Sequence, residues 1–128
     1  MRAIMPPSIR PPLARYSHAM EVPPGLRWVV ASGQLGVAPD GTVPADAAGQ
    51  AALAFANIDA ILAEAGMTRA NVVRINTYLT DRAHAAGYMA ARDAWIGEAA
   101  TPPASTMLIV SGFSRPEFVV EIEVMAAG

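Results

Sequence analysis

Hydrophobic and polar residues follow two different periods along this chain, and the first is the period of a helix. In residues 46–65, Phe55, Ile58 and Leu62 recur at intervals of three and four, which places them on one helical face. Asp46 is a residue type that can cap the first turn of such a helix. The pattern therefore predicts an amphipathic helix over residues 46–65.

The second period is the two-residue alternation of a strand. In residues 72–79 it separates an apolar face from a polar face that carries Arg74, and in residues 118–124 it separates apolar side chains from Glu121 and Glu123. Because the apolar faces should meet the helices, we expect both carboxylates on the opposite face of the sheet. A carboxylate there must be paired, hydrated or shifted in pKa. One interpretation is that Glu123 pairs with an arginine such as Arg74 across the sheet.

The remaining segments, together with the full bounds of the last strand, complete the predicted fold. They are strands at 15–22 and 26–34, a helix at about 82–98 that Asp81 can cap, and strands at 105–111 and 117–125. A turn at Pro23-Pro24-Gly25 predicts that the first two strands form an antiparallel pair. The order of elements predicts an α+β fold, in which two α-helices cover one face of a mixed β-sheet. No third helix is available for the other face, so we expect sister subunits to cover it.

Proline separates an N-terminal arm from a single domain. Residues 1–13 contain four prolines, which predicts an extended arm rather than a helix. Residues 14–128 show no linker, repeat or low-complexity segment, and a chain of 128 residues fits one domain. The apolar content of 53% is high for so small a domain, which also favours burial against other subunits.

The residue types that are missing exclude several kinds of chemistry. The chain has no cysteine, which excludes thiol nucleophiles, disulfides and thiolate metal sites. All nine basic residues are arginine, so no lysine can form a Schiff base. The two histidines, His18 and His84, lie far apart in the sequence, which argues against a histidine-rich metal site. No cofactor or metal is implied.

The charge and hydropathy of the sequence limit the kinds of partner and the location that we expect. The formal net charge is −2 and the arginines are scattered from Arg2 to Arg115, which argues against nucleic acid and anionic membrane surfaces. No apolar run approaches the roughly 18 residues that a membrane span needs. Prolines also interrupt the apolar stretch at the start of the chain, so this segment does not resemble a signal peptide. We therefore expect a cytoplasmic protein whose ligand is a small molecule.

Four short motifs occur in the order and spacing of a known family. They are Tyr16-Ser17-His18-Ala19, Ala31-Ser32-Gly33-Gln34, Thr101-Pro102-Pro103-Ala104-Ser105-Thr106 and Val120-Glu121-Ile122-Glu123. On these motifs, residues 14–126 resemble the RidA-like (YjgF-type) family of reactive-intermediate deaminases. The resemblance implies a chorismate-mutase-like fold that forms a homotrimer, with three clefts between neighbouring subunits.

The resemblance also implies which residues act in the cleft. Glu121 matches a glutamate that positions or activates water, and Thr106 matches a residue whose backbone groups contact substrate or water. Tyr16 and Ser32 match positions that line the cleft. The alternative interpretations are that Tyr16 is a partly buried aromatic residue at an interface and that Ser32 is a turn residue. Met89 falls where many members carry a polar asparagine on the second helix.

One position departs from the family pattern in a way that concerns the substrate. Typical deaminating members carry an arginine at the position of Ala104, where it holds the carboxylate of a 2-imino or enamino acid. Truncating one partner of a buried Arg–carboxylate pair costs about 2–5 kcal/mol, or roughly 30- to several-thousand-fold in affinity or rate. We therefore expect an altered substrate range, with a neutral, cationic or differently placed anionic ligand. Arg15 and Arg115 flank predicted cleft segments and are candidates to replace the missing arginine.

Three functions remain open at this point. The first is a cofactor-free hydrolase of the Rid type, which adds water to a C=N bond with the help of Glu121. The second is a non-catalytic trimer that binds a small molecule in the same clefts. The third is the ribonuclease or translation-inhibitor role attached to some relatives, which the acidic net charge disfavours.

Overall fold

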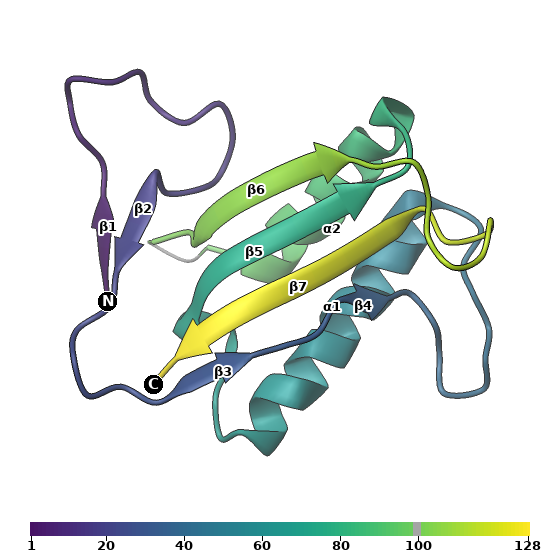
Figure 1. Ribbon diagram of the computed structural model, residues 1–128, viewed down its shortest axis with the longest axis horizontal. Helices are drawn as coiled ribbons and strands as arrows, with labels where there is room; N and C mark the ends of the chain where they lie inside the picture. The colour runs from purple at the N-terminus through teal and green to yellow at the C-terminus, as the bar shows by residue number, and fades with distance from the viewer. Residues whose placement is uncertain (99–100) are drawn as a thin grey trace.

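The computed structural model describes residues 1–98 and 101–128 and arranges most of them around one mixed sheet (Figure 1). In chain order the elements are β1 (Arg2–Ile4), β2 (Ala19–Glu21), β3 (Trp28–Val30), β4 (Gln34–Leu35), α1 (Ala47–Glu64), β5 (Val72–Leu79), α2 (Ala85–Ile96), β6 (Ala104–Ile109) and β7 (Val120–Ala127). Short 3-10 turns at Arg69–Asn71 and Arg82–His84 precede β5 and α2.

The main sheet has the strand order β3-β7-β5-β6, and the short β4 also pairs with β7. Strand β5 is antiparallel to β7 and parallel to β6, because α2 carries the chain back across the sheet between β5 and β6. Both helices lie on the same face of this sheet, behind it in Figure 1. The predicted α+β fold, a mixed sheet with two helices on one face, is confirmed.

The hydrophobic core fills the space between the helices and the sheet. Phe55, Ile58 and Leu62 are buried on the inner face of α1, as their spacing predicts. The ring of Phe55 stacks on Trp95 and Tyr88 of α2, with ring centroids 4.5 and 6.4 Å apart. Since both helices cover this side (Figure 1), the opposite face of the sheet is left open.

The ends of the helices follow from capping residues. The Asp46 carboxylate accepts a hydrogen bond of 2.8 Å from the Gly49 N–H, which caps α1 as predicted. Asp81 accepts a hydrogen bond of 2.8 Å from the Ala83 N–H, but the turn that it caps is a 3-10 turn. The second helix therefore begins three residues later than predicted, at Ala85.

The predicted antiparallel pairing of residues 15–22 with residues 26–34 is wrong. Strand β2 pairs with β1 in a separate two-stranded sheet, and β3 pairs with β7 at the edge of the main sheet. Pro23 and Pro24 have no backbone N–H to donate across a hairpin, and the connection is longer than a tight hairpin turn. Each strand instead satisfies its backbone groups on a partner that is distant in sequence.

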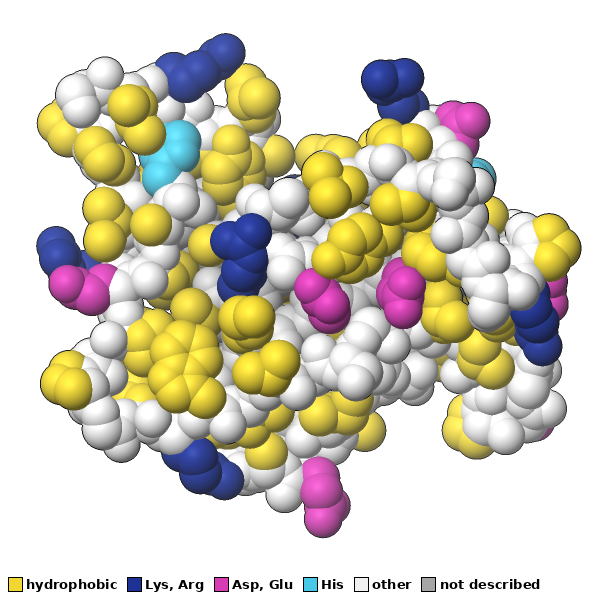
Figure 2. All heavy atoms as spheres, viewed as in Figure 1, with side chains coloured by type: hydrophobic (Ala, Val, Ile, Leu, Met, Phe, Trp, Pro, Cys, Tyr) yellow, Lys and Arg dark blue, Asp and Glu magenta, His cyan; other side chains and the backbone are white. Residues whose placement is uncertain are grey.

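Strand register places the side chains of the open face in rows. Arg74 lies opposite Ala104, Asn76 lies opposite Thr106 and Glu123, and Tyr78 lies opposite Leu108 and Glu121. Figure 2 shows this face, where two acidic side chains and a basic one lie near the centre among hydrophobic groups. The register thus brings together polar residues from three strands that are far apart in the sequence.

Candidate functional site

The two glutamates of β7 define the centre of the candidate site. The alternation of this strand turns Val120 and Ile122 into the core, where both are fully buried. Glu121 and Glu123 are half-buried on the open face, away from the helices. The predicted orientation of the carboxylates is confirmed, and two negative charges are held on a face that no helix covers.

Glu123 is held by two donors from β5. Its Oε1 atom accepts a hydrogen bond of 2.9 Å from the Asn76 side-chain amide and another of 2.9 Å from the Tyr78 hydroxyl. The hydrogen bond to Glu123 raises the pKa of Tyr78 above its ordinary value, and partial burial adds to this effect. The phenol therefore stays protonated, and remains a donor, at neutral and moderately alkaline pH.

The predicted pairing of Glu123 with Arg74 is wrong. The Arg74 guanidinium donates from Nε to Asn76 Oδ1 and from Nη2 to Thr106 Oγ1, both at 2.7 Å. Asn76 therefore lies between the two charges and bonds to both of them. The arginine is shifted toward β6 because Thr106 offers a hydroxyl there at the level of Asn76.

Glu121 differs from Glu123 in having no hydrogen-bond partner among the described residues. Both glutamates line a pocket of about 340 Å³, together with Tyr78, Val110 and Phe113. Gly33 lies against the carboxylate, so closely that a Cβ atom there would be 2.8 Å from Cδ of Glu121. A carboxylate in such a pocket is free to accept a proton from a water molecule or a ligand.

The start of β6 brings two more predicted residues next to this network. Thr106 accepts the hydrogen bond from Arg74, and Ala104 is buried on the same face two residues earlier. Ser17 forms a parallel bridge with Ala104, and its N–H donates a hydrogen bond of 3.0 Å to the Pro103 carbonyl. This bridge places Tyr16 beside the start of β6.

The remaining predicted residues lie around the site or behind it. Ser32 is exposed in the segment between β3 and β4, directly before Gly33. Met89 belongs to α2 and packs against the core, so it lies on the helical side of the sheet. Within one chain, the β6 side of the open face holds Tyr16, Ala104 and Thr106. The β7 side holds Ser32 and Glu121. Met89 does not lie on this face.

Arg15 and Arg115, the candidates to replace an arginine at position 104, are both engaged elsewhere. Arg15 donates hydrogen bonds to the carbonyls of Asp93 and Gly97, at the C-terminal end of α2. Arg115 forms an ion pair of 2.7 Å with Glu117 and lies over the Phe118 ring. His18 is also outside the network, since its Nε2 atom lies 2.8 Å from the Arg10 carbonyl oxygen.

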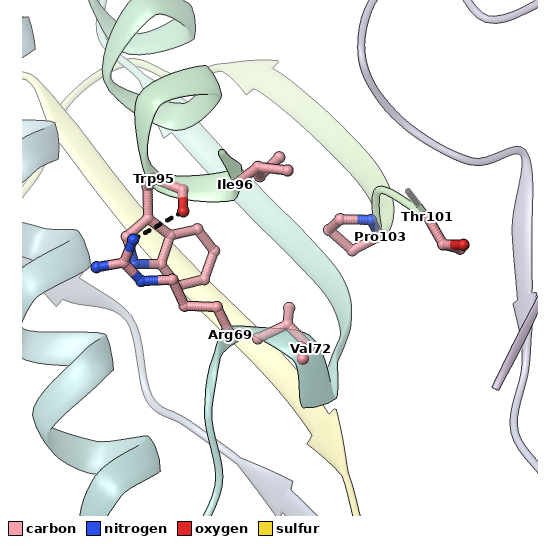
Figure 3. A pocket seen from close by; sticks show the side chains of 7 residues that line it. Arg69, Val72, Trp95, Ile96, Thr101 and Pro103 are labelled. Carbon is pink, nitrogen blue, oxygen red and sulfur yellow. Dashed lines mark hydrogen bonds between the residues drawn. The ribbon is translucent and has the colours of Figure 1, made fainter. Parts of the chain in front are cut away.

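A second hollow, of about 210 Å³, lies between the end of α2 and the start of β6 (Figure 3). Its charged residue is Arg69, which donates to both carboxylate oxygens of Asp59 and to the Trp95 carbonyl oxygen. Trp95 Nε1 also donates to Asp59, at 2.9 Å. Because these polar groups satisfy one another, they tie the two helices together rather than present free chemistry.

The described part of the chain has neither a metal-binding cluster nor a membrane-spanning helix. No group of three or more His, Asp or Glu side chains is arranged there to hold a metal ion. None of the helices found there is both long and apolar enough to cross a membrane.

Asn76, Tyr78 and Gly33 are the residues of this site that sequence reasoning missed. The alternation of residues 72–79 indicated that Asn76 and Tyr78 share a face with Arg74. The pattern gave no signal that Glu123 would be their acceptor, because that depends on the register between β5 and β7.

Comparisons with known proteins agree in the family that they indicate. The family model described as Endoribonuclease L-PSP matches residues 8–128. A RutC family protein of Aquifex aeolicus is 40% identical over 82 residues, which span 63% of this chain and 63% of that relative. The chain thus spans less than two thirds of the length of that relative.

Two solved structures are similar over nearly the whole chain. YyfB of Yersinia pestis, described as a member of the conserved Rid protein family, is 32% identical with a TM-score of 0.88, and the match covers 99% of this chain and 98% of that one. TdcF of Escherichia coli, solved with bound serine, is 26% identical with a TM-score of 0.74, and the match covers 100% of this chain and 99% of that one.

Proposed function

Because the chain belongs to the Rid (YjgF-type) family, we propose that it is a small-molecule hydrolase that acts on imines or enamines. The overall reaction adds water to a C=N bond and yields a carbonyl compound and ammonia. The observation that carries this proposal is the Glu121 carboxylate, which borders a pocket and has no hydrogen-bond partner among the described residues.

Glu121 supplies the base that the reaction needs. Its carboxylate takes a proton from a water molecule as the water oxygen bonds to the carbon of the protonated imine, which gives a carbinolamine. The carboxylate returns this proton to the nitrogen, the C–N bond breaks as the C=O bond forms, and the remaining hydroxyl proton is lost to the departing ammonia. Thr106 and Tyr78 lie on the same face. The Tyr78 hydroxyl, which donates its proton to Glu123, can accept a hydrogen bond from the ligand or the water, and the backbone of Thr106 can orient it. Neither a cofactor nor a metal takes part in this scheme.

The proposed cleft is completed by a neighbouring subunit in a homotrimer. Exposed hydrophobic side chains on the open face support this assembly: Trp28 is 50% exposed, Val30 is 69% exposed and Met125 is 37% exposed. Val30 and Met125 are cross-strand partners, so the three groups form one patch beside the glutamates. Burying such a patch against a sister subunit is favourable. The same face therefore serves both assembly and ligand binding.

The substrate range of this hydrolase differs from that of relatives with an arginine at position 104. Ala104 cannot donate a hydrogen bond from its side chain, so a ligand carboxylate must find another cation or be absent. We do not propose that the protein cleaves RNA, although the matching family model carries an endoribonuclease description. A net charge of −2 and two glutamates on the open face disfavour binding to a polyanion.

Release of ammonia from imines generated in situ tests the proposal. Wild-type protein should accelerate the hydrolysis of at least one class of imine, either a 2-imino acid or an uncharged imine of similar size. Specific binding of such compounds without any acceleration would favour the non-catalytic alternative, a trimer that binds a small molecule. Neither binding nor acceleration with either class would contradict the proposal.

A further inference from the structure

The pocket beside Glu121 is lined by acidic and apolar side chains. Its acidic groups are the half-buried carboxylates of Glu121 and Glu123, which leave β7 on the same face. Its apolar groups include Val110 and Phe113, both half-buried in the segment that follows β6. The Val110 N–H donates a hydrogen bond of 2.8 Å to the Leu79 carbonyl, which fixes the start of this segment against the end of β5. The space of about 340 Å³ is therefore bounded by groups that suit a ligand with a positive charge and a hydrocarbon part.

No basic side chain is among the described residues that line this pocket. Arg74, which shares the open face, donates to Asn76 and to Thr106 on the side of β6. Arg115 is paired with Glu117 at 2.7 Å. Within the described part of the chain, the two carboxylates of the pocket therefore meet no cation, and they would repel a negatively charged ligand group.

The polar groups of the pocket accept hydrogen bonds rather than donate them. Glu121 has no hydrogen-bond partner within the described part of the chain, so one of its oxygens can bind a ligand nitrogen while the other binds water. The Tyr78 hydroxyl gives its only proton to Glu123 and offers a ligand its lone pairs. A ligand that fits these groups must bring the donors, and a protonated imine brings N–H groups on a positively charged nitrogen.

We propose that the substrate is an imine without a carboxylate, which binds as a protonated cation to Glu121 and packs its hydrocarbon group on Val110 and Phe113. The inference rests on the proposed function and makes it specific, because it names apolar imines derived from amines as the substrate class. Such a compound is uncharged until its nitrogen is protonated. The protonated cation and one water molecule give an aldehyde or ketone and an ammonium ion, so no further reactant is needed.

Ala104 fits this class of ligand. The family resemblance leads one to expect an arginine at this position, where it would hold a ligand carboxylate. A ligand without a carboxylate needs no such arginine, and a positive charge on the same face would oppose the binding of a cation. The alanine and the acidic pocket therefore favour the same kind of ligand.

Binding of stable analogues tests this inference independently of turnover. Benzamidine is a planar cation whose amidinium group resembles a protonated imine and whose ring can pack on Phe113. Benzamide has nearly the same shape without the charge. Calorimetric titration of wild-type protein should show benzamidine binding about tenfold or more tighter than benzamide. Benzoate, which has the same ring and a negative charge, should bind no tighter than benzamide.

Three variants separate the charge of the pocket from its shape. Glu121→Gln should lower the preference for benzamidine about tenfold and leave benzamide binding nearly unchanged, because the pocket stays intact. Glu64→Gln removes the same charge from the exposed end of α1, so it is the matched control and should leave the preference unchanged. Phe113→Ala should weaken both ligands by about 2- to 10-fold and preserve their ratio. Wild-type protein that does not prefer benzamidine, or a Glu121→Gln variant that keeps the preference, would overturn the inference.

Turnover distinguishes the failure of this inference from the failure of the proposed function. The imine of benzaldehyde lacks a carboxylate, and the imine of phenylglyoxylate carries one on the same carbon. Relative to the spontaneous rates, wild-type protein should accelerate hydrolysis of the first at least about tenfold more than that of the second. Acceleration of the 2-imino acid alone would leave the proposed function standing and refute the inference. If neither imine is accelerated, the proposed function fails, and the preference for benzamidine still decides whether the pocket binds a cation.

Discussion

The Tyr78 hydroxyl donates a hydrogen bond of 2.9 Å to Glu123, and the same carboxylate oxygen accepts a hydrogen bond from Asn76. Glu123 therefore has both a fixed position and a fixed role as an acceptor, whereas its neighbour Glu121 has no such partner within the described residues. We interpret Glu123 as the residue that holds β5 and β7 in register on the open face and Glu121 as the residue that faces the ligand.

This relationship predicts an unusual titration of Tyr78. Its hydrogen bond to Glu123 raises its pKa, so the midpoint of its ionisation should lie above the ordinary value of about 10. The phenol is more easily ionised in the unfolded chain, so its contribution to stability is complete below about pH 10 and is lost as the pH rises through the folded pKa. The difference between the ultraviolet titrations of wild-type protein and Tyr78→Phe isolates this group. Glu123→Gln should lower the midpoint, and a midpoint that does not move would refute the assignment.

The close approach of Gly33 to Glu121 allows the Glu121 carboxylate to be displaced without a change at position 121. A methyl group at position 33 would meet the Glu121 side chain, with Cβ only 2.8 Å from Cδ, so Gly33→Ala should push the carboxylate out of place. We expect turnover to fall about 10- to 100-fold, since a general base contributes about 10²–10⁴-fold and depends on its geometry. The free energy of unfolding should change much less, because the carboxylate can move into the open pocket. The side chain of Glu121→Asp is shorter and leaves room for the methyl group, so Gly33→Ala should lower turnover less in the Glu121→Asp variant than in wild-type protein. If Gly33→Ala has no effect on the turnover of wild-type protein, Glu121 is not the base.

The hydrophobic patch on the open face predicts the oligomeric state. Val30 is 69% exposed in the single chain, and a charge at this position would oppose its burial in an interface. Val30→Arg should convert the proposed trimer into smaller species in sedimentation velocity experiments. Ala52→Arg, on the exposed side of α1, is the matched control and should leave the trimer intact. A wild-type protein that sediments as a monomer at micromolar concentrations would contradict the proposed assembly.

Gln50 predicts how the segment before β7 is held in place. Its fully buried side chain donates to the carbonyls of Pro44 and Glu117, at 2.9 and 2.8 Å, and accepts from the Val119 N–H at 3.0 Å. Gln50→Leu would leave three backbone groups without partners, so we expect a loss of about 2–4 kcal/mol in the free energy of unfolding. Urea denaturation measures this loss. Asn57→Leu removes one hydrogen bond, of 3.4 Å to the Leu35 carbonyl, and should lower the free energy of unfolding by about 1 kcal/mol or less. If Gln50→Leu costs no more than Asn57→Leu, the hydrogen bonds of Gln50 do not hold this segment in place.

The sequence was most informative where local periodicity decides the structure. The spacing of Phe55, Ile58 and Leu62 predicted the buried face of α1, and the alternation in β7 predicted which way Glu121 points. Such patterns depend only on which face of an element meets the core. The two helices, the central strand and the outward carboxylates could therefore be predicted without the structure.

The pairing of strands could not be predicted in the same way. Alternation places Arg74 and Glu123 on one face but does not say which residues lie opposite each other, because that depends on the register between distant strands. Asn76 bonds to both side chains, and the predicted ion pair is replaced by a chain of hydrogen bonds. The nearness of Arg74 to Ala104 is likewise a result of the parallel register of β5 and β6.

The measurement that tests the account most directly is the rate of imine hydrolysis, with a 2-imino acid and with an uncharged imine of similar size, by wild-type protein, Glu121→Gln and Glu123→Gln. The account predicts that wild-type protein accelerates the reaction and that Glu121→Gln loses about 100-fold or more, since its amide cannot accept the proton from water. Glu123→Gln should retain most of the activity, because an amide oxygen can still accept the hydrogen bonds from Asn76 and Tyr78. Equal losses in both variants, or a wild-type rate no faster than the spontaneous reaction with both imines, would contradict the account.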